Sequence, residues 1–284
     1  MIKENKKIIR NFINQSLIED VGDGDHSALS CIPKEATGKA KLIFKSDGIA
    51  AGISLAESIL LQLDKNMKIA FNIKDGEIFE HGMVGFVAEG NIHALLKGER
   101  LLLNCIQRMS AIATLTAAYV VEVNHTKCKI LDTRKTTPNF RFLEKWAVRL
   151  GGGFNHRFGL YDMIMLKDNH VDFCGGIRPA LEKAKLYNSQ RASKLFIEIE
   201  TRNLKEVEEA INCKIADRIM LDNFVPKDII TALKIIDGAA QTEASGGINL
   251  STIASYAEAG VDFISVGALT HGVKSLDISF KTLL

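Results

Sequence analysis

The sequence lacks the short motifs that identify the most common nucleotide-binding and hydrolytic enzymes. It has no GxxxxGK[ST] loop, and no GxGxxG segment that follows a strand and opens a helix. A GxSxG turn, an HExxH helix and cysteine or histidine pairs at metal-binding spacing are also absent. We therefore expect neither a P-loop or Rossmann nucleotide site nor a serine hydrolase or zinc protease.

Cysteine, proline and net charge are low as well. The five cysteines are scattered without a CxxC pair, which is typical of reduced thiols in a cytosolic protein. The net charge of +2 predicts no general attraction to nucleic acid or membrane. The N-terminus has no apolar core of a signal peptide, and no apolar run approaches the ~20 residues that cross a bilayer. We expect a cytoplasmic protein that binds neither nucleic acid nor membrane.

The second half of the chain alternates short apolar segments with amphipathic helices. Asn203 is expected to cap one helix, with Glu206 as capping-box partner, and Pro226 to open another that ends at Gly238. Such alternation predicts a parallel sheet with helical crossovers. Six segments have strand character: KCKILDTRK, YDMIMLKDNH, KLFIEIE, DRIMLDN, AAQTEASGG and VDFISVGA.

Polar residues gather towards the C-terminal ends of these six segments. They are Arg134, Lys135, Lys167, Asp168, Glu198, Glu200, Asp222, Glu243 and Ser245. An α/β barrel with its active site at the C-terminal mouth predicts this arrangement. Because we find six strands rather than eight, we expect the barrel to be incomplete.

The first ~110 residues follow another pattern. Strand-like runs are separated by Asp-Gly, Asn and Gly turn signals, and SLAESILLQL between them is helical. A long helix, KGERLLLNCIQRMSAIATLTAAYVVEVN, follows this region. We predict a small α/β domain over residues 1–112 and a barrel domain over residues 113–284.

Basic and acidic side chains at the predicted mouth suggest a polyanionic substrate. The basic residues are Arg134, Lys135, Arg141, His156, Arg157, Lys167 and His170. Cations that converge on one cavity repel each other unless an anion joins them, and Arg binds carboxylate or phosphate with two parallel hydrogen bonds. Glu198, Glu200 and Asp222 are spaced like ligands for a hard cation such as Mg²⁺.

At this point the sequence resembles the quinolinate phosphoribosyltransferase family over nearly the whole chain. Eight blocks occur in the family's order: IEDVGDGDHS, GERLLLNCIQRMSAIAT, LDTRKTTPNFR, EKWAVRLGGGFNHRFGLYDMIMLKDNH, IEIE, IMLDN, EASGGI and DFISVGALTHGVKSLDIS. The resemblance implies an N-terminal α/β sandwich and an open, about seven-stranded TIM-like barrel. It also implies a homodimer, sometimes assembled further into hexamers, whose subunits share active sites.

The implied reaction joins quinolinate to phosphoribosyl pyrophosphate (PRPP) and yields nicotinate mononucleotide, pyrophosphate and CO₂, with Mg²⁺ required. By resemblance, Arg134, His156 and Arg157 hold the two carboxylates of quinolinate, with Thr133 alongside. Arg100 reaches in from the partner subunit. Lys135 and Lys167 stabilise the leaving pyrophosphate. Glu200 and Asp222 serve the ribose and the metal, and the 5′-phosphate lies against Ser245, Gly246, Gly247, Gly267 and His271.

Two details of the resemblance carry further expectations. Asn139 stands where the family usually has Gly, and because Asn tolerates left-handed backbone angles we expect the turn to be kept. The glycines Gly151, Gly152 and Gly153 do not have the spacing of a nucleotide loop, and we expect them to let the backbone pass beneath a planar ligand.

Three other functions fit parts of the pattern. A relative associated with molybdenum-uptake operons shares many blocks, but the paired grip on two carboxylates favours quinolinate. Lys167 at a barrel strand also suits a Schiff-base aldolase, which borohydride trapping with a carbonyl substrate would reveal. A non-catalytic anion-binding protein is the third, and the presence of residues for both substrates argues against it.

Overall fold

A computed structural model describes residues 5–283 of the chain. By internal contacts the chain divides into two compact units. The N-terminal unit comprises the chain up to Leu115 together with Thr137–Gly151 and Val273 to the end. The barrel unit comprises Thr116–Thr136 and Gly152–Gly272. Two segments beyond residue 112 therefore belong with the first unit, which no pattern in the sequence indicated.

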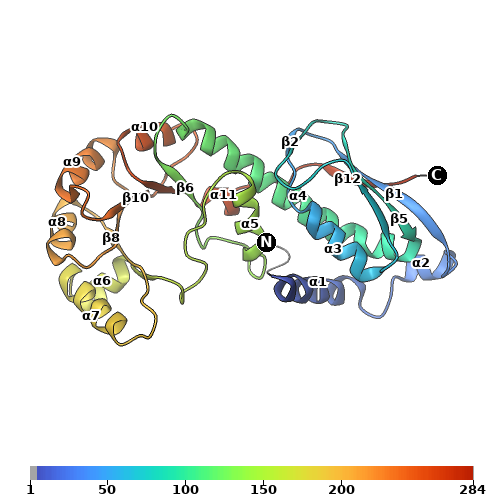
Figure 1. Ribbon diagram of the computed structural model, residues 1–284, viewed down its shortest axis with the longest axis horizontal. Coiled ribbons are helices and arrows are strands. Elements are labelled where there is room, and N and C mark those ends of the chain that lie inside the picture. Colours follow the sequence, from blue (N-terminus) through green and yellow to red (C-terminus); the bar gives the residue numbers. More distant parts are fainter. Residues whose placement is uncertain (1–4, 284) are drawn as a thin grey trace. The chain divides into compact units, whose positions relative to one another are not determined.

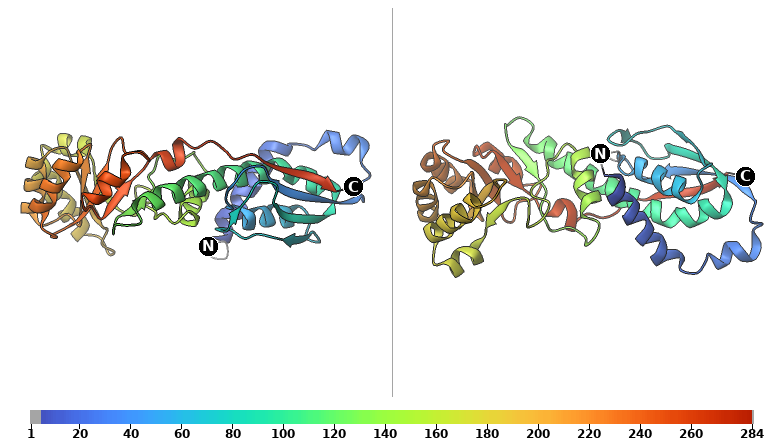
Figure 2. Two further views of the ribbon diagram at one scale, coloured as in Figure 1. Left: turned by 90° about the horizontal axis from the view of Figure 1, so that it is seen from above. Right: turned by 60° about the horizontal axis from the view of Figure 1, so that its bottom comes forward.

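The N-terminal unit is built on a four-stranded antiparallel sheet (Figures 1 and 2). Its strands, in spatial order, are β12 (Ile278–Leu283), β1 (Thr37–Phe44), β5 (Val84–Asn91) and β3 (Lys68–Phe71). The last strand of the chain pairs with the first, so that Phe280 lies opposite Leu42. A short pair, β2 (Gly48–Ile49) and β4 (Ile78–Phe79), lies apart from this sheet.

Four helices lie wholly in this unit: α1 (Lys6–Val21), α2 (His26–Cys31), α3 (Ile53–Leu63) and α5 (Arg141–Leu150). The long helix α4 (Ile92–Val123) begins here and ends in the barrel unit. A side chain at Gly98 of α4 would meet Leu60 and Leu63 of α3 at 3.1–3.2 Å, so this glycine allows the two helices to pack closely.

Helix α4 is long and apolar enough to cross a membrane, judged by length and composition alone. This differs from our expectation that no segment approaches that length. Its most apolar stretch is 61% buried within the structure, and the core helix of a globular protein passes the same test. The helix is therefore weak evidence for a membrane span.

The barrel unit contains a six-stranded parallel sheet, and all six strands predicted from the sequence are found in it. Their spatial order is β6 (Lys129–Leu131), β11 (Phe263–Ser265), β10 (Gln241–Ser245), β9 (Arg218–Asp222), β8 (Ile197–Thr201) and β7 (Ile164–Leu166). Strands β6 and β7 form the two edges, and a single parallel bridge joins Phe154 to β6 at Leu131. The sheet is thus an open barrel with an isolated seventh position.

Helices follow the strands in sequence (Figure 1): α6 (Asp168–Cys174), α7 (Ile177–Ser189), α8 (Leu204–Cys213), α9 (Pro226–Ile236), α10 (Ile253–Glu258) and α11 (Ala268–His271). The predicted helix starts are confirmed. Asn203 accepts from the backbone of Glu206 at 3.0 Å, and Pro226 is the first residue of α9. The Glu206 carboxylate binds the Arg202 backbone instead of closing a capping box.

Two turn predictions can be compared with the backbone. Asn139 has φ 61°, so the turn expected at this substitution is confirmed. Helix α9 ends at Ile236, and Asp237 takes the left-handed conformation one residue before the predicted end at Gly238.

Candidate active site

A cavity of about 810 Å³ opens in the barrel unit at the C-terminal ends of its strands. It brings together all but one of the residues that the family resemblance assigned to the site: Thr133, Arg134, Lys135, His156, Arg157, Lys167, Glu200, Asp222, Ser245, Gly246, Gly247, Gly267 and His271. Three further residues expected at the mouth, Arg141, His170 and Glu198, do not line this cavity. The position of these residues at strand ends explains the convergence, because parallel strands deliver their C-terminal ends to one mouth.

Arg100 lies elsewhere, in the N-terminal unit. It lines a separate cavity of about 460 Å³ with Phe12, Glu19, Asn104 and Arg108. The resemblance expected Arg100 to act in the active site of a partner subunit, and that role stays a prediction.

The basic side chains of the cavity come from three segments. Arg134 and Lys135 lie in the loop after β6, Arg157 follows the Phe154 bridge, and Lys167 follows β7. Neither Arg134 nor Arg157 forms an ion pair with a carboxylate within residues 5–283. Burial, and then the nearby charge of Arg134, lower the pKa of Arg157. This repulsion between two guanidinium groups marks a place that an anion would stabilise.

The loop that carries Arg134 and Lys135 is held by hydrogen bonds to its backbone. The Thr270 hydroxyl of α11 donates to the Lys135 carbonyl at 2.8 Å, and the Lys135 amide donates to the Thr133 hydroxyl at 3.0 Å. The two basic side chains remain exposed. The loop is thus fixed at its backbone while its charges face the cavity.

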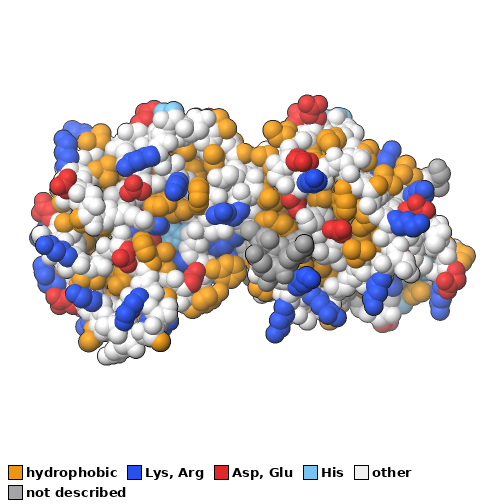
Figure 3. Space-filling model, in the orientation of Figure 1, with side chains coloured by type: hydrophobic (Ala, Val, Ile, Leu, Met, Phe, Trp, Pro, Cys, Tyr) orange, Lys and Arg blue, Asp and Glu red, His pale blue; other side chains and the backbone are white. Residues whose placement is uncertain are grey.

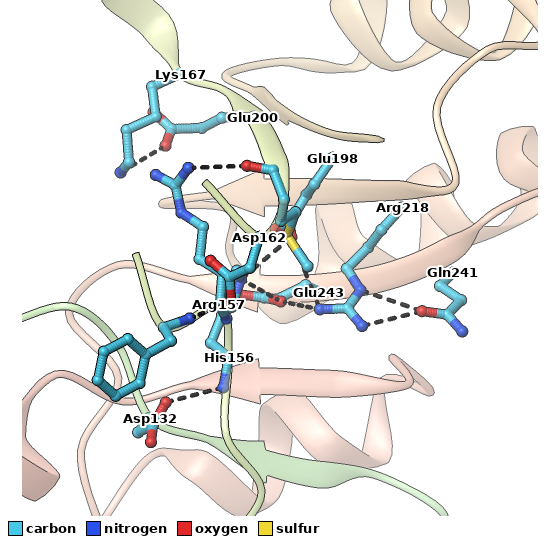
Figure 4. Close-up of polar contacts among 12 residues, drawn as sticks. Asp132, His156, Arg157, Asp162, Lys167, Glu198, Glu200, Arg218, Gln241 and Glu243 are labelled. Atoms are coloured by element: carbon cyan, nitrogen blue, oxygen red, sulfur yellow. Dashed lines mark hydrogen bonds and ion pairs between the residues drawn. The ribbon is translucent and has the colours of Figure 1, made fainter. Parts of the chain in front are cut away.

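The acidic residues lie on neighbouring strands. Glu200 of β8 is buried and lies 3.3 Å from the Lys167 Nζ, as Figure 4 shows. Asp222 ends β9, and its carboxylate accepts from the Asn223 side-chain amide at 2.6 Å. Burial raises the pKa of Asp222 more than Asn223 and Lys167 lower it. Proteins usually hold Mg²⁺ through one or two carboxylates, so Glu200 and Asp222 are cavity residues that could hold this ion.

The turn after β10 brings backbone close to Asn223. Gly246 has φ 97°, and a side chain there would lie 2.9 Å from the Asn223 backbone nitrogen. The Asn223 backbone amide donates to the Ser245 carbonyl at 2.8 Å. Glycine is therefore required at this position for both angle and space.

His156 is one of three buried residues among those that the resemblance assigned to the site, with Arg157 and Glu200. Its Nε2 is 3.1 Å from the Glu198 Oε2 and 3.5 Å from the Glu243 Oε2 (Figure 4). Burial opposes a charge on the ring, but contacts with Glu198 and Glu243 outweigh it and raise the pKa of His156. The Arg157 backbone amide lies 2.7 Å from Nδ1 and donates to it when the ring is neutral, and the single proton of the neutral ring is then on Nε2.

Glu198 and Glu243 are fully buried, and Arg218 supplies a positive charge beside them. Its Nη1 lies 2.9 Å from the Glu243 Oε2 and 3.7 Å from the Glu198 Oε2. The pKa of Glu243 is lowered because His156 and Arg218 outweigh its burial, whereas burial and the charge of Glu243 raise that of Glu198. His156, Glu198 and Glu243 present ligand atoms within 4.8 Å of one another, but the guanidinium already fills the role of a cation there.

Asp168 and Glu243 were expected at the mouth without an assigned role, and both line the cavity. Six further cavity residues were not predicted from the sequence: Met165, Met220, Asn223, Ile248, Ser265 and Ala268. Asn223 follows a strand-ending aspartate and has φ 57°, and Asn at such a turn is a detectable signal. Glu243 had a signal too, because it is a charged residue inside an apolar strand. The glycines Gly151, Gly152 and Gly153 lie outside the cavity lining, and Gly152, at φ 87°, follows the end of α5. The cavity lining gives no support to our expectation that they pass beneath the ligand, which stays a prediction.

Lysine and arginine side chains are mixed with acidic ones over the face seen in Figure 3. The visible surface carries no single extended basic field, in agreement with the net charge of +2. The basic character of the site is therefore local to the cavity.

Two family profiles, two related sequences and one solved structure that match this chain all belong to one enzyme family. The family profile described as "Quinolinate phosphoribosyl transferase, C-terminal domain" matches residues 112–281, and the corresponding N-terminal domain matches residues 25–110. The chain is 43% identical to the "probable nicotinate-nucleotide pyrophosphorylase [carboxylating]" of Bacillus subtilis, over 97% of this chain and 94% of that protein. It is 42% identical to the "quinolinate phosphoribosyltransferase [decarboxylating] 1b" of Nicotiana tabacum, over 96% and 82%. A solved nicotinate-nucleotide pyrophosphorylase from Francisella tularensis superposes with a TM-score of 0.90 at 40% identity, covering 98% of this chain and 96% of that one.

Proposed function

The chain belongs to the quinolinate phosphoribosyltransferase family, and we propose that the cavity at the barrel mouth is where it performs the family's reaction. The reaction transfers phosphoribose from PRPP to quinolinate and releases pyrophosphate and CO₂, leaving nicotinate mononucleotide. The observation that carries the assignment is one cavity that joins unpaired guanidinium groups to buried carboxylates.

Arg134 and Arg157 are the proposed partners of the two quinolinate carboxylates. Planar guanidinium groups bind carboxylates through paired hydrogen bonds, and a dianion offsets the repulsion between them. Thr133 lies beside them in the same cavity. The role of His156 is developed in the next subsection.

The remaining residues are proposed to hold PRPP. The turn at Ser245, Gly246 and Gly247, together with Gly267 and His271, offers backbone and side-chain donors for the 5′-phosphate. Glu200 and Asp222 lie where carboxylates can bind ribose hydroxyls and Mg²⁺. When bound, the metal would neutralise charge on the pyrophosphate.

The chemistry requires charge stabilisation rather than a protein nucleophile. The quinolinate nitrogen forms a bond to C1′ of the ribose as the bond from C1′ to pyrophosphate breaks, and Lys135 and Lys167 stabilise the departing anion. Carboxylates near C1′ stabilise the positive charge that develops there. The quaternised ring then accepts the electron pair released when the carboxylate at C2 leaves as CO₂, and a proton replaces it.

We also propose that the protein is a homodimer in which Arg100 completes the partner's site, with hexamers as a further possible assembly. Support comes from Arg100 itself, an arginine that lines a cavity of the N-terminal unit and is not among the residues that line the barrel-mouth cavity. If the site is shared, an inactive Arg100→Ala protein mixed with an inactive Arg134→Ala protein should regain activity. Equal inactivity of the mixture and its components would contradict a shared site.

A cytoplasmic location is proposed from the five free cysteines, which are typical of a reducing compartment. Two plant relatives carry the word chloroplastic in their names. Fractionation of cells that produce the protein would decide between these compartments.

The function is tested by incubating the protein with quinolinate, PRPP and Mg²⁺. We expect CO₂ and nicotinate mononucleotide, and no product when nicotinate replaces quinolinate. Equal activity with nicotinate would overturn the assignment, since the two arginines would then have no second carboxylate to bind.

A further inference from the structure

Both ring nitrogens of His156 face groups of the protein. Nε2 faces the carboxylates of Glu198 and Glu243, and Nδ1 accepts from the Arg157 backbone amide. The side chain is only 5% exposed. With both nitrogens facing the protein, the buried ring is not oriented to donate to a quinolinate carboxylate.

The carboxylates behind the ring are themselves fixed. Arg218 binds Glu243, donates from Nη2 to the Gln241 side-chain oxygen at 3.0 Å, and stacks on the Phe263 ring at 4.0 Å. These contacts come from three adjacent strands, β9, β10 and β11, so the position of the carboxylates is set by the sheet. Arg218 does not line the cavity.

The main chain of His156 is also anchored. Its amide donates to the buried Asp132 at 2.8 Å, directly after β6. The segment therefore has one anchor at β6 through its backbone and a second at β8 and β10 through the imidazole. Because His156 is held at both points, its ring has a fixed position relative to the sheet, and this constrains the position of the next residue.

That neighbour is Arg157, whose guanidinium lines the cavity and donates to the Met163 carbonyl at 3.4 Å. The Arg157 backbone is oriented by the bond from its amide to His156 Nδ1. A displacement of about 1 Å in a group that binds substrate can lower the rate on the order of 100-fold.

We infer that His156 is a positioning residue, which connects the buried carboxylates of the barrel to the Arg157 backbone and thereby aims the Arg157 guanidinium at the substrate. It does not bind quinolinate itself. This inference rests on the proposed role of Arg157 in binding a quinolinate carboxylate.

A double-mutant cycle separates the two roles. His156→Gln should lower kcat/KM for quinolinate about 30-fold at saturating PRPP and leave the KM for PRPP within about twofold, because only the aim of Arg157 is lost. In an Arg157→Ala background the same change should cost less than about threefold, since the group it positions is gone. An equal loss in both backgrounds would show that His156 binds quinolinate directly and would overturn the inference.

His271 provides the matched control, because it lines the same cavity on α11. His271→Gln should lower kcat/KM for quinolinate by the same factor in the wild-type protein and in the Arg157→Ala background. Arg157→Ala without effect on quinolinate would remove both the role of Arg157 and the inference, while Arg134→Ala would still test the proposed function.

The wild-type protein gives a second measurement that does not depend on variants folding. Nitrogen-15 spectra of the histidine rings should show His156 protonated on Nε2, with the same protonation and hydrogen bonding of both ring nitrogens with and without bound quinolinate. A change in protonation or hydrogen bonding at either ring nitrogen when quinolinate binds would mean that the ring contacts the substrate, and would overturn the inference.

Discussion

Aspartates at the two ends of the barrel strands have pKa values that are shifted in opposite directions. At the N-terminal end, Asp262 precedes β11 and accepts from both the amide and the hydroxyl of Thr242, at 2.9 and 2.8 Å. Burial opposes its charge, but these bonds and Lys127 lower the pKa of Asp262. At the C-terminal end, burial raises the pKa of Asp222, which has Asn223 as its hydrogen-bonded partner.

Arginines show the same contrast. Arg218 begins β9 and is paired with Glu243 and Gln241, whereas Arg134 and Arg157 at the mouth have no carboxylate partner in the described part of the chain. The guanidinium of Arg218 is neutralised within the protein, and those of Arg134 and Arg157 are left for a ligand. Stability and binding are thus separated along each strand, as expected of this architecture.

The largest expected effect concerns the mouth. Arg134→Ala should lower kcat/KM for quinolinate roughly 100- to 1000-fold, because a desolvated carboxylate loses its guanidinium partner. PRPP affinity, measured by calorimetry, should change little, and so should the melting temperature. Equal loss of affinity for both substrates would contradict the assigned role of Arg134. It would also contradict the separation of stabilising charges from binding charges along the strands.

Asp222→Asn should reduce the rate on the order of 100-fold by removing one carboxylate proposed for ribose and metal. Unlike Arg134→Ala, it should raise the concentration of Mg²⁺ needed for half-maximal activity. The measurement is a Mg²⁺ titration at fixed PRPP. An unchanged Mg²⁺ requirement would show that the metal contacts PRPP and water alone.

Gly246→Ala should raise the KM for PRPP about tenfold, because the new methyl group lies against Asn223 and the left-handed angle costs roughly 1–2 kcal/mol. Gly238→Ala is its matched control, with φ 72° and open space around the position. That variant should lose stability of similar size without any change in KM. A similar KM effect in both would mean that strain, rather than the cavity wall, is responsible.

The smallest effect concerns the N-terminal end. Asp262→Asn should cost about 1 kcal/mol of unfolding free energy near pH 7 and leave both KM values unchanged. Because the folded-state pKa is lowered, the stabilisation exists above the ordinary Asp pKa of ~4 and disappears as pH falls through the folded value. Urea unfolding at several pH values should show the two proteins converge in acid. Glu258→Gln, with a side chain 60% exposed, should show little difference at any pH.

Much of the fold followed from local patterns. The six barrel strands are continuous apolar runs that end in polar residues, and this pattern gave their number, their parallel arrangement and the mouth to which they point. Asn203, Pro226 and Asn139 act through their own backbone chemistry, so their positions could be predicted without knowledge of the rest of the chain.

Other features depend on contacts between distant segments. The pairing of β12 with β1 joins the two ends of the chain, and nothing in the local composition of either strand specifies the other. Arg218 and Gln241 were not singled out, because their importance comes from the register that sets them beside each other and near Glu198 and Glu243.

The sequence by itself determined the barrel, its mouth and the set of charged residues there, because strand periodicity and residue chemistry are local properties. The tertiary structure decided how those residues divide their work. His156 and Arg157 are adjacent in the chain and looked equivalent as ligands for one anion. Only the folded chain sets one ring against two buried carboxylates and leaves the next guanidinium facing the cavity.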